Sequence, residues 1–134
     1  MIDAKVREQA RQRAGDRCEY CRLRQIHDPY HVFHVEHVVA RQHRGTDDLE
    51  NLAWACHQCN LHKGTNLAST DPDTNEVTRL FHPRRDRWEN HFALGGSRIV
   101  GRTAIGRTTA WLLQMNAEER VELRSVLLKL GELD

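Results

Sequence analysis

Two Cys-x-x-Cys pairs constrain the fold of this chain more than any other feature of its sequence. The pairs are Cys18 with Cys21 and Cys56 with Cys59, and 34 residues separate them. Zinc prefers four soft or borderline ligands in a tetrahedron, and each Cys-x-x-Cys turn presents two thiolates to one metal. We therefore expect one structural zinc ion per chain. Its closed shell would leave no open position, so any chemistry must lie elsewhere.

Disulfides account for the cysteines less well than zinc does. The first residues mix both charges and lack the apolar stretch of a secretory signal, and no apolar run approaches the roughly 20 residues of a membrane span. We expect a soluble, cytoplasmic protein with no membrane partner, in which thiols stay reduced and disulfides are disfavoured. Unliganded thiols and a redox pair are the remaining alternatives.

The segment between the two pairs is longer than the roughly 15 to 20 residues of a common zinc ribbon, so a structural unit is inserted there. Residues 30–40 are rich in β-branched and aromatic residues and predict a strand. The apolar residues 52–55 predict the strand that returns to Cys56. Zinc would clamp both ends of this hairpin. A short helix is expected over residues 60–67, although Gly64 weakens it.

A single α+β domain is the default for 134 residues. Asp3 can cap a first helix that stops near Gly15. Asn116 with Glu119 resembles a capping box at the start of the last helix. The expected parts are an N-terminal helix within 1–17, a zinc-braced core over 18–67, a loop over 66–75, a strand over 77–81, and a C-terminal extension over 76–134 with a short hairpin at Gly95-Gly96 and two helices.

The charge of the chain is informative in its distribution and not in its total. A net charge of +1 does not indicate a nucleic-acid-binding protein. From Arg79 to Arg107, however, seven arginines face only two acidic residues. A solvated surface is the plain interpretation of such a run. The alternative is contact with a nucleic-acid backbone, for which the candidates are Arg84, Arg85 and Arg87.

Polar residues suited to catalysis cluster in and just after the expected hairpin. Six of the nine histidines lie between His31 and His62. A histidine on an exposed loop is ordinarily a solvated residue, so the pattern matters more than any one member. Four motifs make up this pattern: CEYC at 18–21, VEHVV at 35–39, GTDDLENL at 45–52 and ACHQCNLHKG at 55–64.

In the order and spacing of these motifs the sequence resembles the His-Asn-His (HNH) endonuclease family, in the variant whose ββα-metal (His-Me finger) core is flanked by two Cys-x-x-Cys pairs. The resemblance covers about residues 15–66. The segment from Phe81 through Trp88 to the final helix also looks like the tail of stand-alone bacterial members. The resemblance implies a DNA endonuclease that nicks one strand per active centre and leaves 5′-phosphate and 3′-hydroxyl ends. A double-strand break would need a homodimer or two successive nicks.

The resemblance also implies roles for the matched residues. His37 would be the general base, and Glu36 and His62 would hold a catalytic divalent cation. Asn51 would hydrogen-bond to backbone and hold the base in position, unless it is a plain turn asparagine. The residues that could contact DNA are Asn60, Lys63 and His57, with a helix cap as the alternative for Asn60; His34 and His43 are taken as bystanders.

Glu36 and His37 are adjacent, and adjacent residues on a regular strand point to opposite faces. A shared site therefore predicts that the strand ends or bulges there. A carboxylate with an imidazole is a mixed ligand pair, so Mn²⁺, Co²⁺ or Ni²⁺ should support activity alongside Mg²⁺. Two further functions stay open: a zinc-braced nucleic-acid-binding module without chemistry, and a subunit of a larger defence or mobile-element system.

Overall fold

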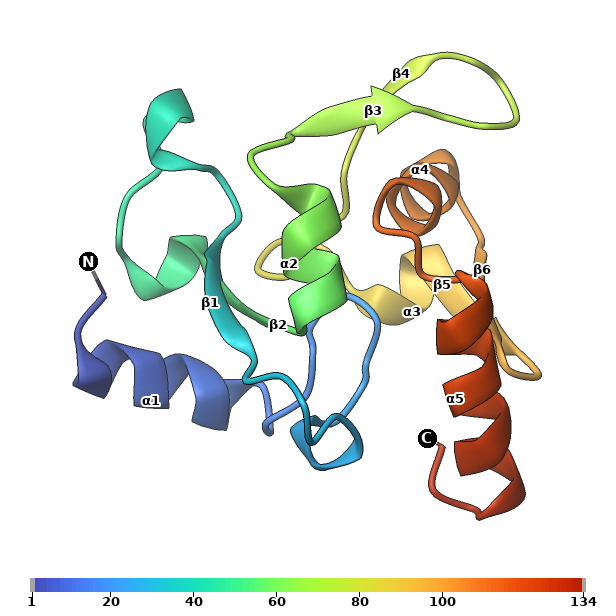
Figure 1. Cartoon of the computed structure of the whole chain (residues 1–134). Coiled ribbons are helices and arrows are strands. Elements are labelled where there is room, and N and C mark those ends of the chain that lie inside the picture. Colours follow the sequence, from blue (N-terminus) through green and yellow to red (C-terminus); the bar gives the residue numbers. More distant parts are fainter. Residues whose placement is uncertain (1, 134) are drawn as a thin grey trace. The chain divides into compact units, whose positions relative to one another are not determined.

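The computed structural model describes residues 2–133, which form two compact units (Figure 1). Unit 1 contains residues 2–67 and 82–86, and unit 2 contains residues 68–81 and 87–133. The fold is mixed, with small two-stranded antiparallel sheets and five α-helices in these residues. None of the described helices has both the length and the apolar character needed to cross a membrane. That the chain acts as one domain stays a prediction.

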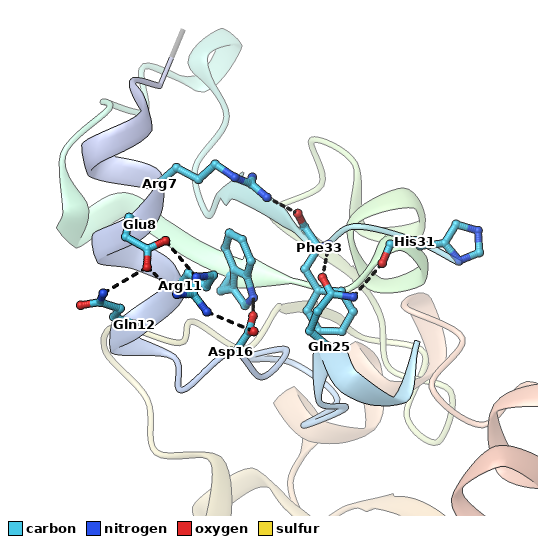
Figure 2. A network of polar contacts seen from close by, with 9 residues as sticks. Arg7, Glu8, Arg11, Gln12, Asp16, Gln25, His31 and Phe33 are labelled. Carbon is cyan, nitrogen blue, oxygen red and sulfur yellow. Dashed lines mark hydrogen bonds and ion pairs between the residues drawn. The ribbon is translucent and has the colours of Figure 1, made fainter. Parts of the chain in front are cut away.

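Unit 1 begins with helix α1, Ala4–Arg13, which starts after the predicted cap. The Asp3 side chain accepts a hydrogen bond from the Val6 amide, and Gly15 follows the helix with a φ of +65°. Polar contacts tie α1 to the rest of the unit (Figure 2). Arg7 donates to the Phe33 carbonyl at 3.0 Å, and its guanidinium lies 4.6 Å from the centre of the Trp54 ring.

The predicted hairpin is present as strands β1, His34–His37, and β2, Leu52–Ala55. The first strand is shorter than the expected 30–40 because the segment before it is held as a loop. The Gln25 side chain donates to the His31 carbonyl and accepts from the Phe33 amide, both at 2.8 Å (Figure 2). All four residues of β2 are buried, which makes this strand the centre of the unit.

Helix α2, His57–Lys63, follows β2 directly and packs against β1. It begins three residues earlier than the sequence predicts because Cys56 caps it, and its sulfur accepts from the Cys59 amide. It ends at Gly64, which has a φ of +52°. The helix therefore starts within the second cysteine pair.

Unit 2 contains two further hairpins and three helices. Its elements are β3 (Ala68–Thr70), β4 (Val77–Arg79), α3 (Trp88–His91), β5 (Phe92–Gly95), β6 (Arg98–Gly101), α4 (Ala104–Leu112) and α5 (Glu118–Lys129). The turn predicted at Gly95-Gly96 joins β5 to β6. The predicted loop over 66–75 instead contains β3, which pairs with β4.

The predicted capping box at Asn116 is wrong. Helix α5 begins after Ala117, and no side-chain hydrogen bond caps it. The Asn116 side chain is used elsewhere, because it accepts from the Ile99 amide at 2.8 Å and donates to the Ile99 carbonyl at 2.7 Å. This asparagine ties the turn before α5 to strand β6.

Candidate metal centre and catalytic site

The four cysteines come together as predicted. Their sulfurs all lie within 4.8 Å of one another, and all four residues are buried. A tetrahedron of Zn–S bonds of about 2.3 Å has edges of about 3.8 Å. The sulfurs of Cys21 and Cys56 are 3.7 Å apart, which matches that edge. Four buried thiols at this spacing are a donor set that fits one zinc ion.

Local backbone structure sets the direction of these sulfurs. In the first pair the Cys21 amide points at the Cys18 sulfur at 3.4 Å, and in the second the Cys59 amide points at the Cys56 sulfur at the same distance. Burial raises the pKa of Cys18 well above its usual range, and the neighbouring sulfurs raise it further. Without a cation this thiol therefore keeps its proton, and metal binding must displace it.

His37 lies at the end of β1 and is paired with an acidic residue that the sequence motifs do not single out. The His37 Nε2 is 2.8 Å from Oδ1 of Asp47. Asp47 also accepts from Arg41 through both oxygens, at 2.8 and 2.7 Å. The hydrogen bond from His37, together with Arg41, lowers the pKa of Asp47. Asp47 is thus a carboxylate that can only accept a hydrogen bond, so the His37 Nε2 carries the proton.

Asn51 binds backbone on both sides of the loop that follows β1. Its Oδ1 accepts from the Val39 amide at 2.9 Å, and its Nδ2 donates to the carbonyls of Val39 at 2.9 Å and Thr46 at 2.7 Å. Gly45 lies against this contact, because a Cβ there would be 1.6 Å from the Val39 carbonyl oxygen and 2.9 Å from the Asn51 Nδ2. The loop that carries Asp47 is therefore closed tightly onto the end of β1.

Glu36 lies on the opposite face of β1 from His37. The pairing of β1 with β2 is regular through Glu36 and His37, and no bulge separates them; the strand ends at His37, which is one of the two outcomes that the sequence predicts. The Glu36 side chain is 3% exposed; its Oε1 is 2.5 Å from the Lys63 Nζ, and its Oε2 accepts from the Tyr20 hydroxyl at 2.7 Å. Burial raises the pKa of Glu36 and the contacts with Lys63 and Tyr20 oppose that rise.

Lys63 is correspondingly inaccessible. It is 1% exposed, and its Nζ also donates to the carbonyls of Val38 at 2.9 Å and His37 at 3.4 Å. These contacts occupy the ammonium group, so a phosphate contact from Lys63, which stays a prediction, would require the side chain to leave them. The two residues instead form a buried polar cluster with Tyr20 under β1, which we call the Glu36 cluster.

The remaining candidates on α2 are more accessible. His62 is half-buried, and its Nε2 is 3.2 Å from Oε1 of Gln58. Asn60 is half-buried inside the helix and does not cap it. The His57 ring is stacked on that of His31, with centroids 4.5 Å apart, and lies 5.7 Å from that of His34. His34, taken as a bystander, therefore supports His57.

The three arginines chosen as backbone contacts differ in their surroundings. Arg84 is 12% exposed and forms an ion pair with Glu19, so this arginine is committed within unit 1. Arg85 is exposed in the same unit, and Arg87 is exposed in unit 2, directly before α3. Arg85 and Arg87 are thus the members of this group with a side chain open to a ligand.

Asp47 and the Glu36 cluster were the features missed from the sequence. Asp47 lies within the GTDDLENL motif, but the spacing alone does not say which of its acidic residues faces His37. For Glu36 the signal was available, because strand alternation already assigned it to the face opposite His37. The structure follows that alternation.

Comparison with known proteins agrees with the geometry of this region. The model of the family described as HNH endonuclease matches residues 18–66, which span both cysteine pairs, the hairpin and α2. Neither the curated proteins nor the solved structures gave a match. Residues 18–66, which contain the four gathered cysteines, His37 and Asn51, are thus similar to the HNH endonuclease family.

Proposed function

We propose that this protein is a metal-dependent DNA endonuclease that nicks one strand per active centre, with His37 as the general base. The match of residues 18–66 to the HNH endonuclease family model supports a nuclease in general. The observation that carries the finer proposal is the pair between His37 and Asp47, on a loop that Asn51 holds closed. The products would be a 5′-phosphate and a 3′-hydroxyl.

The contact with Asp47 prepares His37 for this role. Since the Nε2 donates to a carboxylate, a neutral His37 ring has its lone pair on Nδ1. That nitrogen can take a proton from a water molecule that attacks phosphorus. Asp47 then stabilises the imidazolium that forms, and it acts as an orienting group without leaving its carboxylate state. The His37 side chain is 22% exposed, which leaves it accessible to water.

Asn51 supports the same step through the backbone. Its three hydrogen bonds fix Val39 and Thr46 relative to each other, and these residues flank His37 and Asp47 along the chain. A displacement of the loop would lengthen the contact between His37 and Asp47. We therefore propose Asn51 as a positioning residue for the general base.

A catalytic divalent cation, when bound, would neutralise charge on the phosphate and on the departing oxygen. We propose His62 as one of its ligands, because its ring is half-buried and engages only a glutamine amide oxygen among the described residues. Glu36 can join it only after leaving its contacts with Lys63 and Tyr20. We expect Mn²⁺, Co²⁺ or Ni²⁺ to support activity alongside Mg²⁺, as an imidazole ligand favours.

The order of β1, β2 and α2 supports a ββα-metal core, with zinc holding both ends of the hairpin. Zinc in a shell of four thiolates supplies rigidity and no open coordination position. For DNA, we propose contacts from His57, Asn60, Arg85 and Arg87, which are exposed or half-buried. A break of both strands would require a homodimer or two nicks.

Incubation of supercoiled plasmid with the full chain tests this proposal. We expect conversion to open circles with Mg²⁺, Mn²⁺, Co²⁺ or Ni²⁺ and none without added divalent metal. DNA ligase should reseal the nicks, because it joins a 5′-phosphate to a 3′-hydroxyl. Nicks that ligase cannot reseal would contradict the proposed products. Absence of nicking with every metal, together with retained DNA binding, would favour a binding module.

A further inference from the structure

A hollow on unit 2 lies between α4, the start of β6 and the turn at residues 72–73. Its volume is about 360 Å³. Pockets for small ligands range over roughly 300–1,000 Å³, so this hollow has room for one nucleotide-sized group. Three exposed side chains at its edge, Arg98, Trp111 and Gln114, can reach a ligand there.

The walls of the hollow are held in place by contacts within unit 2. The buried Asp71 fixes Arg107 through both carboxylate oxygens, at 2.8 and 3.2 Å. On the other side, Asn116 is hydrogen-bonded to both the amide and the carbonyl of Ile99. Helix α4 packs on β6 so closely that a Cβ at Gly101 would lie 2.3 Å from the Arg107 amide nitrogen. A ligand would therefore meet a site that needs little ordering.

The side chain of Trp111 is an indole without a partner in residues 2–133. The residue is 56% exposed, and its ring makes no hydrogen bond, ring contact or cation–π contact within that part of the chain. The other tryptophans are engaged: Trp54 is 1% exposed, and the ring of Trp88 packs 5.2 Å from that of Phe92. A large ring left in water beside a hollow offers a face for stacking.

Arg98 supplies the available positive charge. The charge of Arg107 is balanced by Asp71, and Asp73 lies 3.1 Å from its Nε. The Arg98 guanidinium, in contrast, has no acidic partner among the described residues. A cation, an indole and the Gln114 amide thus line the opening, together with Asp73, whose charge is taken up by Arg107. The first three groups match the phosphate, base face and base edge of one nucleotide.

We propose that this hollow binds one nucleotide of a single-stranded nucleic acid, with the base stacked on Trp111 and a phosphate held by Arg98. An unpaired base presents its faces to a protein, whereas a duplex keeps them stacked inside the helix. The site lies in unit 2 and goes beyond the proposed cleavage by unit 1. Binding here can therefore hold or fail independently of nicking.

Binding of a labelled 12-nucleotide oligothymidine to the full, zinc-loaded chain, followed by fluorescence anisotropy without added divalent metal, tests the proposal. We expect changes in the hollow to weaken binding of this strand more than binding of a duplex of the same length. Loss of one stacked base weakens binding roughly 5- to 150-fold, so Trp111→Ala should raise Kd by that factor. Trp111→Phe, which keeps a ring face, should recover most of the affinity.

Charge variants separate the hollow from the basic stretch as a whole. Arg98→Ala should weaken binding and lower the slope of log Kd against log salt by about 0.7, the value for one phosphate on a single strand. Arg102→Ala is the matched control, because Arg102 is exposed just after β6 but does not line the hollow. Unchanged affinity for the single strand in Trp111→Ala, or equal effects of the two arginine variants, would each overturn the proposal.

Discussion

The ion pair between Glu36 and Lys63 in the Glu36 cluster can be tested by its effect on the free energy of unfolding. At 2.5 Å, an effective dielectric constant of 20 gives a gross attraction between Glu36 and Lys63 of about 7 kcal/mol. Transfer of the two ions out of water costs several kcal/mol each, so the pair as a whole contributes little to stability. Removal of one partner leaves the other buried without its counter-charge, which costs about 3–5 kcal/mol.

The perturbation is a double-mutant cycle with Glu36→Gln, Lys63→Met and the two combined. Each single variant should lose about 3–5 kcal/mol of unfolding free energy. The double variant should lose only about 2 kcal/mol, which corresponds to the bonds that Lys63 no longer donates to the carbonyls of His37 and Val38. The expected coupling is therefore at least about 4 kcal/mol, because the two single losses add to at least about 6 kcal/mol and the double variant loses about 2 kcal/mol.

Urea denaturation with excess zinc, followed by tryptophan fluorescence, to which the buried Trp54 contributes, measures these values. The combined variant isolates the charge pair because both ions are absent from it. If the losses of the single variants simply add, Glu36 and Lys63 are not an ion pair in solution. Glu36 would then be free to bind a cation, as the family resemblance implies.

Three further predictions follow from the site. Asp47→Asn removes the carboxylate that keeps the proton on the His37 Nε2, so nicking should slow by about 10²- to 10⁴-fold. Stability should change little because Asp47 is 47% exposed, and an unchanged nicking rate would contradict the proposed tautomer of His37. Gly45→Ala forces a Cβ against the Val39 carbonyl and should lower the free energy of unfolding, measured with urea, by at least about 1–3 kcal/mol. Thr46→Ala, at an exposed neighbour, should lower it much less, and equal stabilities of the two variants would contradict the closed loop. Because burial raises the pKa of Cys18, protons compete with zinc for its sulfur. Release of zinc to a chromogenic chelator should therefore become faster as pH falls, and a release rate that does not depend on pH would contradict thiolate ligation.

The gathering of the four cysteines and the hairpin could be predicted because they depend on local chemistry. Cys-x-x-Cys spacing determines how two sulfurs are presented, and the residues between the pairs carry clear strand signals. The exact ends of the elements depend on contacts that the sequence does not display. β1 begins at His34 because the Gln25 side chain holds the preceding segment, and α2 begins at His57 because a cysteine sulfur caps it.

The environment of Glu36 could not be read from a motif. The family resemblance assigned it to a catalytic cation, while strand periodicity assigned it to the other face of β1. The outcome depends on Lys63 and Tyr20, which come from separate segments and meet Glu36 only in the folded unit. The role of Asp47 could not be predicted from a motif either, because its contact with His37 requires the loop that Asn51 closes.

The central claim is that a zinc-braced hairpin presents His37 to a phosphodiester bond as a base. The most direct measurement is the single-turnover nicking rate of His37→Ala, beside His43→Ala as a control at an exposed histidine of the same loop region. A general base contributes about 10²- to 10⁴-fold, so His37→Ala should slow nicking at least about 100-fold while retaining one zinc per chain. His43→Ala should match the wild type. A His37→Ala protein that nicks at the wild-type rate would contradict the account.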